Sequence, residues 1–228
     1  MKLNEKSIPN AYPLIIYEDF RKCVQGFNFY LGLCVGSLEL FVYPNPESLG
    51  IIKNHIFKMP DKDGIWQNSM DAFNYCFEKT PPPNLQLALY ILAFNWDKFI
   101  NLIGDFIFIA GHFYPQIQIH SYLHNLHKGG FDQQIRRISE CSSLDFKISP
   151  TDYENSLEFF QVRHLGVHNG WMVDDGYLKN SPNHKEFVKN EIRLFKIDEM
   201  ELWMRSLLSI GKLIAEELAD NFSNTYSG

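Results

Sequence analysis

The sequence lacks the short motifs by which several large enzyme classes are recognised. It contains no G-x-x-x-x-G-K-[ST] loop, no G-x-G-x-x-G turn, no H-E-x-x-H pair and no G-x-S-x-G elbow. Each of these motifs places a reacting group or a phosphate through a fixed local geometry. Without them, nucleotide-triphosphate hydrolysis, dinucleotide-dependent chemistry, zinc-protease activity and α/β-hydrolase activity lose their main support.

Cysteine and positive charge are also scarce. The four cysteines are scattered and form no C-x-x-C pair. A reduced, cytoplasmic protein is therefore the expected context. The net charge of -6 argues against a generally basic nucleic-acid-binding surface, although a local positive groove remains compatible with it.

Long uncharged apolar runs are missing as well. Phe27–Tyr43 is short for a bilayer span and carries Glu39, and Leu85–Ala110 is interrupted by three charged residues. The first ten residues have no apolar core of the kind found in secretory signals. We therefore expect no membrane association.

Apolar residues, by contrast, make up 45% of the chain and aromatic residues 15%, enough for a sizeable core. They recur at helical spacing, which predicts helices over 13–42, 47–57, 66–77, 85–113, 117–127, 131–141, 150–168 and 197–222. The segment 85–113 is the expected central helix. Residues 171–190 look irregular, and 191–197 is compatible with a short extended segment.

No repeat or linker divides the chain, so one all-α domain over 1–228 is predicted, a helical bundle. The helices of its motif-bearing part, 84–222, follow from a clearer apolar pattern than those of residues 1–80. Residues of capping type predict three helix starts, with Asn84 and Asp198 as N-caps and Thr151 with Glu154 as a capping box. In the helix from 150, Leu157, Phe160 and Val167 form the expected apolar face.

Three histidines, His120, His124 and His127, stand at spacing i, i+4, i+7. This spacing puts them on one helical face, where they could hold zinc with a fourth ligand from elsewhere. The alternative is a polar surface face ending near a helix C-terminus. No cysteine or acidic residue in register completes a metal site, so we favour the surface face and expect no cofactor.

Asp97, Lys98 and Asp105 interrupt the apolar pattern of the central helix. Two carboxylates two turns apart are conceivable as an acid–base pair. The alternative, which we favour, is a partly buried polar stripe or a subunit contact.

Polar groups suited to chemistry are crowded together in the octet Arg163-His164-Leu165-Gly166-Val167-His168-Asn169-Gly170. Its Asn-Gly end is a typical helix terminus. One interpretation is structural, because arginine and histidine near a helix C-terminus satisfy free carbonyls and complement the dipole. The other is an active site. Glu158, five residues before Arg163, either orients this arginine or is solvated.

The octet resembles the R-x(4–6)-H motif of the HEPN superfamily of all-α domains. Arg163 and His168 match its two defining positions, and His164 matches the polar residue that commonly follows the arginine. The resemblance extends from about Tyr153 to Leu218, through Val173-Asp174, Tyr177-Leu178 and Glu191-Ile192-Arg193-Leu194.

The resemblance implies a metal-independent endoribonuclease or RNA-binding domain, of a kind that acts as a toxin or in defence. His168 would be the general acid–base group, because histidine is the side chain whose ordinary pKa lies nearest neutrality. Arg163 would stabilise charge on the phosphoryl oxygens. His164 and Asn169 would support orientation and substrate contact.

The spacing raises one difficulty, since residues five apart on a regular helix point about 140° apart. Either the long Arg163 side chain reaches around the helix, or the helix ends near His168, or a second subunit completes the site. The resemblance implies such a homodimer, to which Phe27–Tyr43 could contribute, and sometimes a protein partner encoded in the same operon. The alternative function is a non-catalytic, dimeric helical interaction module.

Overall fold

The computed structural model describes residues 11–26, 80–81, 83–111 and 126–224. Within these ranges the protein is helical and contains no β-strand, which confirms the all-α prediction. The expected helices at 47–57 and 66–77 lie outside the described residues, as do most of 117–127 and the second half of 13–42.

A helix over 12–26 comes first in the described part. The elements that follow are α4 (Pro83–Gly111), α5 (Phe131–Ser142), α6 (Pro150–His168), α7 (Asp175–Asn180), the 3-10 turn η2 (His184–Glu186) and α8 (Ile197–Asn224). The helices predicted over 85–113, 131–141, 150–168 and 197–222 agree with α4, α5, α6 and α8 to within two residues at each end. None of the described helices is long and apolar enough to cross a bilayer.

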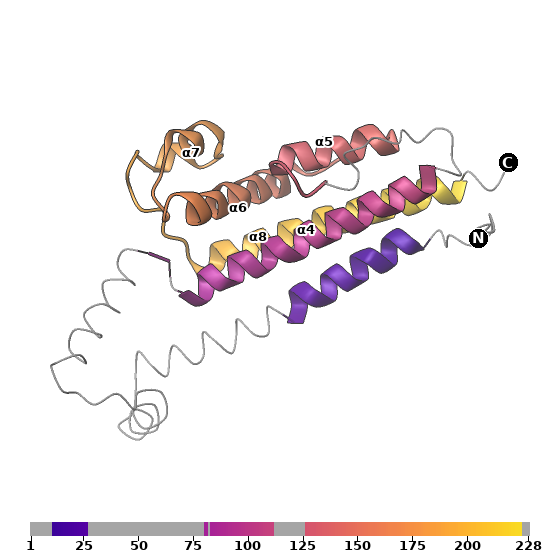
Figure 1. The fold of residues 1–228 in the computed structure, drawn as a ribbon, viewed down its shortest axis with the longest axis horizontal. Helices are drawn as coiled ribbons and strands as arrows, with labels where there is room; N and C mark the ends of the chain where they lie inside the picture. The colour runs from indigo at the N-terminus through magenta and orange to yellow at the C-terminus, as the bar shows by residue number, and fades with distance from the viewer. Residues whose placement is uncertain (1–10, 27–79, 82, 112–125, 225–228) are drawn as a thin grey trace, which may run out of the picture.

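The long helices form a bundle in which α4 and α8 run in the same direction and α6 runs against both (Figure 1). Helix α6 packs most extensively on α8, and α4 contacts α5, α6 and α8. Helix α7 lies at one end of the bundle, beside the C-terminal end of α6 (Figure 1).

The predicted central helix α4 supplies much of the core. Its Trp96 and Phe99 are buried, and Phe20 of helix 12–26 stacks on Phe99 with ring centroids 4.9 Å apart. On the far side of Trp96, Phe131 at the start of α5 lies at 5.9 Å. Burying large aromatic rings on several helices at once contributes about 2–3 kcal/mol for each fully buried side chain.

The predicted N-caps are wrong by two residues in each of the three helices. Ser149, not Thr151, caps α6: its hydroxyl accepts a hydrogen bond from the Asp152 backbone N–H at 3.1 Å. Helix α4 begins at Pro83 and α8 at Ile197, so Asn84 and Asp198 stand inside the first turn. Proline at the first helical position explains the shift in α4 and α6, because its fixed φ starts the helix and its missing N–H needs no partner.

The segment 171–196 has more structure than predicted. Its α7 is started by the Asp174 side chain, which accepts a hydrogen bond from the Tyr177 backbone N–H at 2.7 Å. The extended stretch near 191–197 is confirmed as a single antiparallel bridge between Met172 and Ile192. A short Asp-initiated helix lacks the repeated apolar spacing by which longer helices are predicted.

Candidate functional site

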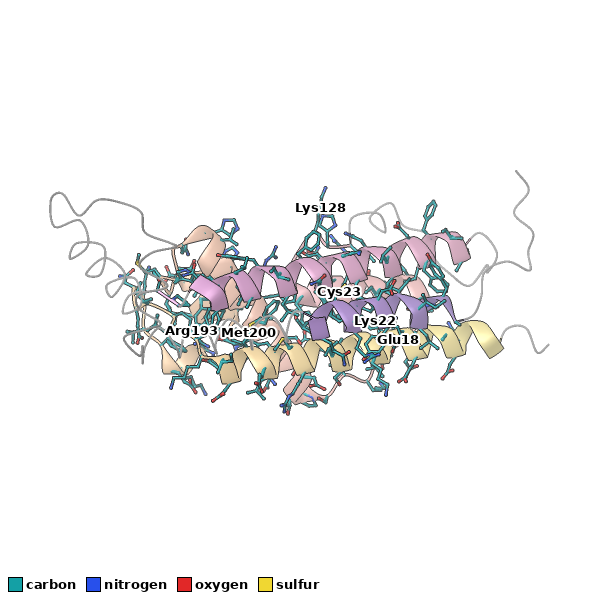
Figure 2. The ribbon with its side chains drawn as sticks, turned by 90° about the horizontal axis from the view of Figure 1, so that it is seen from below. Glu18, Lys22, Cys23, Lys128, Arg193 and Met200 are labelled. Carbon is teal, nitrogen blue, oxygen red and sulfur yellow. The ribbon has the colours of Figure 1, made fainter. Side chains whose placement is uncertain are left out.

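A cavity of about 370 Å³ lies at the C-terminal end of α6. Helix α6 contributes Arg163, His164, Val167 and His168 to its lining. The remaining walls include Gly129 and Gly130 before α5, and Gly176 and Asn180 of α7. Lys128, next to this glycine pair, projects away from the bundle (Figure 2). The two defining positions of the motif therefore share one cavity.

Arg163 and His168 both lie within α6, so the helix end alone does not bring them onto one face. The helix stops at His168, with Asn169 as its C-cap, so the predicted helix terminus is confirmed. His164 and His168, one turn apart and both exposed, have ring centroids 4.6 Å apart. Residues five apart on a helix diverge in direction, yet Arg163 and His168 both line the same cavity.

The turn that ends α6 depends on two residues with positive φ, Gly170 at +56° and Trp171 at +70°. The backbone N–H groups of Asn169 and Trp171 both donate to the Leu165 carbonyl, at 2.8 and 3.1 Å. The indole of Trp171 then lies against Gly166, where an added Cβ would be 2.4 Å from the ring. Gly166 is thus required for close packing at the base of the site.

Val167 differs from its prediction. It lines the cavity and is exposed, although the helical pattern placed it on the apolar face. Phe160 is buried as predicted and Leu157 is partly buried, and Phe159, Val162 and Leu165 complete the apolar face of α6. The cause is the orientation of the last turn, which faces the cavity and solvent.

Arg163 forms an ion pair with Asp97 of α4, with 3.6 Å between Nη2 and Oδ2. Burial raises the pKa of the Asp97 carboxyl, while the Arg163 guanidinium and a hydrogen bond from Gln134 act in the opposite direction. The pattern of α4 suggested a polar stripe for Asp97. A carboxylate on an apolar helix is unusual and could have marked Asp97 as a candidate. No neighbouring residue in the sequence connected Asp97 with the octet.

Asn169 does not line the cavity. Its side-chain amide donates a hydrogen bond to the carboxylate of Asp174. Asp174 is also the N-cap of α7, which carries Gly176 and Asn180. Asn169 therefore connects the end of α6 with one wall of the cavity.

Glu158 neither orients Arg163 nor is solvated, which corrects both readings of the sequence. It is 2% exposed and accepts hydrogen bonds from the hydroxyls of Tyr177, at 2.5 Å, and Ser181. Arg193, 3% exposed, pairs with it at 3.0 Å. These contacts hold the segment 171–196 on α6, at the end of the bundle where Figure 2 labels Arg193.

Ionisation in this cluster is fixed by burial and charge. Burial, and then the Glu158 carboxylate, raise the pKa of Tyr177, which stays protonated and donates its hydrogen bond. Burial lowers the pKa of Arg193, but Glu199, Tyr177 and Glu158 raise it by more than burial lowers it. The net pKa is therefore raised, and the guanidinium stays charged. The cluster is a buried charged pair that is extensively hydrogen-bonded.

Of the three clustered histidines, His120 and His124 lie outside the described residues. His127 is in a turn after them, with its Nδ1 at 2.9 Å from the Asn101 side-chain oxygen. No group of three histidine, cysteine, aspartate or glutamate side chains in the described ranges is arranged to hold a metal ion.

The cavity thus combines two imidazoles, which can accept and donate protons, with a guanidinium that suits phosphoryl oxygens. Three of its lining residues are glycines, which add no side chain to its walls. Comparisons of the chain with protein-family models, with curated proteins and with solved structures found no match.

Proposed function

We propose that the protein is a metal-independent endoribonuclease of the HEPN type. The observation that carries the proposal is that Arg163, His164 and His168 line one cavity at the end of α6. General acid–base groups and a fixed cation are what cleavage of RNA by its own 2′-hydroxyl requires. The HEPN resemblance extends the proposal to a cytoplasmic toxin or defence factor with an operon-encoded partner.

In the proposed reaction the 2′-oxygen attacks the adjacent phosphorus. His168 removes the proton from the 2′-hydroxyl as the general acid–base group, the bond from phosphorus to the 5′-oxygen breaks, and a solvent proton neutralises the departing 5′-oxygen, while His164 orients the substrate. Arg163 stabilises the charge that develops on the non-bridging oxygens. The products are a 2′,3′-cyclic phosphate and a 5′-hydroxyl end.

The test is cleavage of end-labelled, single-stranded RNA by purified protein in excess EDTA. His168→Ala should reduce the rate by a factor of about 10²–10⁴, the usual contribution of a general acid–base group. His184→Ala is the matched control, since His184 in η2 is half-buried and does not line the cavity. Equal cleavage by wild type and His168→Ala would rule out the assignment, provided that circular dichroism shows both folded.

The second candidate is a dimeric helical interaction module without catalysis. It is favoured by exposed apolar side chains beside the site, notably Phe94 at 68% and Val167 at 52%. The ion pair from Asp97 to Arg163 and the ring contact from Tyr90 to Trp171 align α4 with α6 so that positions 94 and 167 come opposite each other.

Sedimentation separates the two candidates when it is combined with the cleavage assay. A stable dimer that does not cleave RNA, and that Phe94→Glu dissociates, would favour the interaction module. A dimer that cleaves RNA would fit a homodimeric ribonuclease, in which two copies of the motif face each other. A monomer at working concentration would exclude the homodimer in both cases.

A further inference from the structure

We infer that Asp97 is a positioning residue for Arg163, which holds the guanidinium in the cavity and so governs the rate of cleavage rather than the strength of RNA binding. The inference rests on the proposed ribonuclease function and adds to it a residue from α4, outside the motif. It begins from the ion pair between Arg163 Nη2 and Asp97 Oδ2, 3.6 Å long.

Arg163 needs such a partner because its side chain is long and 38% exposed. An arginine side chain at a surface samples many rotamers, and ordering it costs conformational entropy. A catalytic cation that is already in place avoids that cost when the substrate reacts. Asp97, whose side chain is 19% exposed, is the more buried member of the pair.

Asp97 is itself held from two elements. Its Oδ1 accepts a hydrogen bond of 3.4 Å from the Nε2 of Gln134 in α5. Gln134 is buried, donates to the His127 carbonyl at 3.0 Å and accepts from the Trp96 indole at 2.8 Å. A chain of hydrogen bonds therefore connects the carboxylate to the core of the bundle, so the charge that attracts Arg163 is itself held in place.

The electrostatics indicate that the charge of Asp97 does not stabilise the fold. Burial raises the pKa of its carboxyl despite the opposing effects of Arg163, Gln134 and His127. The ionised form is thus less favourable in the folded protein than in the unfolded chain. A neutral residue would serve the fold better, whereas a carboxylate can orient a guanidinium.

The same geometry predicts opposite effects on rate and on binding. A carboxylate beside Arg163 opposes the approach of an RNA phosphate, so its neutralisation should leave affinity unchanged or raise it. Loss of orientation should slow the chemical step, because even small displacements of a catalytic group are costly. A merely structural role for Asp97 would reduce both quantities together.

The experiment compares wild type, Asp97→Asn, Asp97→Glu, Arg163→Met and the double variant Asp97→Asn/Arg163→Met. Single-turnover cleavage of unmodified RNA gives the rate, and binding of a 2′-O-methylated oligonucleotide of the same sequence gives the Kd without cleavage. Asp105→Asn is the matched control, because Asp105 is an exposed carboxylate two turns further along α4.

Asp97→Asn should slow cleavage by about 10- to 100-fold with a Kd within about threefold of wild type or tighter. Asp97→Glu should recover part of the rate, Arg163→Met should lose both rate and affinity, and Asp105→Asn should match wild type. The double variant should be no slower than Arg163→Met alone, because residues that act through one another are not additive. A wild-type rate in Asp97→Asn, or additive losses in the double variant, would overturn the inference.

An independent measurement keeps the inference separate from the proposed function. The ¹⁵N relaxation of the Arg163 side-chain Nε–H reports whether the guanidinium is held. Asp97→Asn should make this group mobile, whereas Asp105→Asn should not. If wild type fails to cleave RNA, the ribonuclease proposal falls, and an Arg163 signal that is equally rigid with and without Asp97 would overturn the positioning role as well.

Discussion

Replacement of Arg193 by methionine should destabilise the protein by about 3 kcal/mol, because it leaves the Glu158 carboxylate buried without its cation. The two side chains are 3% and 2% exposed, and their ion pair is 3.0 Å long. Breaking a buried pair from one side costs about 3–5 kcal/mol. The lower end applies here because Glu158 keeps the hydrogen bonds from Tyr177 and Ser181.

Urea unfolding, followed by far-UV circular dichroism, measures this loss. With a slope of about 1–3 kcal/mol per molar urea, the midpoint should fall by about 1–3 M. Arg205→Met is the matched control: Arg205 is 76% exposed and pairs with Glu201 at 3.4 Å on the same helix. Exposed pairs of this kind contribute about 0.5 kcal/mol or less.

The double variant Arg193→Met/Glu158→Gln completes the test. Glutamine removes the stranded charge, keeps one acceptor oxygen for Tyr177, and can donate its amide N–H to the Ser181 hydroxyl oxygen, so most of the lost stability should return. A loss below about 1 kcal/mol in Arg193→Met, no larger than in Arg205→Met, would refute the view that this buried pair holds the segment 171–196.

Three further changes probe the site and its helix. Gly166→Ala should destabilise by about 1–3 kcal/mol in urea, since its methyl group would lie 2.4 Å from the Trp171 ring; unchanged stability would mean that the indole moves aside. Asp97→Asn should be more stable than wild type at neutral pH, because burial raises the pKa of Asp97 and makes its ionised form costly. This difference in stability should vanish as the pH falls, because the Asp97 carboxyl of wild type becomes protonated. Urea titrations across the acid range measure the difference, and an increase at low pH would contradict the reasoning. Ser149→Ala should cost about 1 kcal/mol by thermal unfolding, whereas Thr151→Ala should be near neutral, and equal losses would argue against Ser149 as the cap.

The helices were predictable because their signal is local and repeated. Along α4 the apolar residues recur over many turns, and the fold buries them as the pattern indicates, with Leu89, Trp96 and Ile103 fully inside. The C-terminal end of α6 was predictable for a similar reason, since Asn169 and Gly170 suit a helix terminus. The first residues of the helices were less predictable, because a proline and a residue of capping type can each start a helix within two or three positions of each other.

Pairings between distant side chains were not predictable. Glu158 and Arg193 are 35 residues apart in sequence, and nothing near either residue indicates the other. The same holds for Asp97 and Arg163, whose contact exists only because α4 packs against α6. The candidate site could therefore be predicted only in part. The motif indicated Arg163 and the histidines, whereas the contact with the Asp97 carboxylate became known only from the fold.

The cavity draws all its lining residues from a continuous stretch, Gly129 to Asn180. These residues belong to the turn before α5, to α6 and to α7, so changes in the part of the chain before Gly129 leave every lining residue in the sequence. Asp97 of α4 lies before this stretch and contacts the lining residue Arg163, so replacement of α4 would change the surroundings of that guanidinium as well as the stability of the bundle.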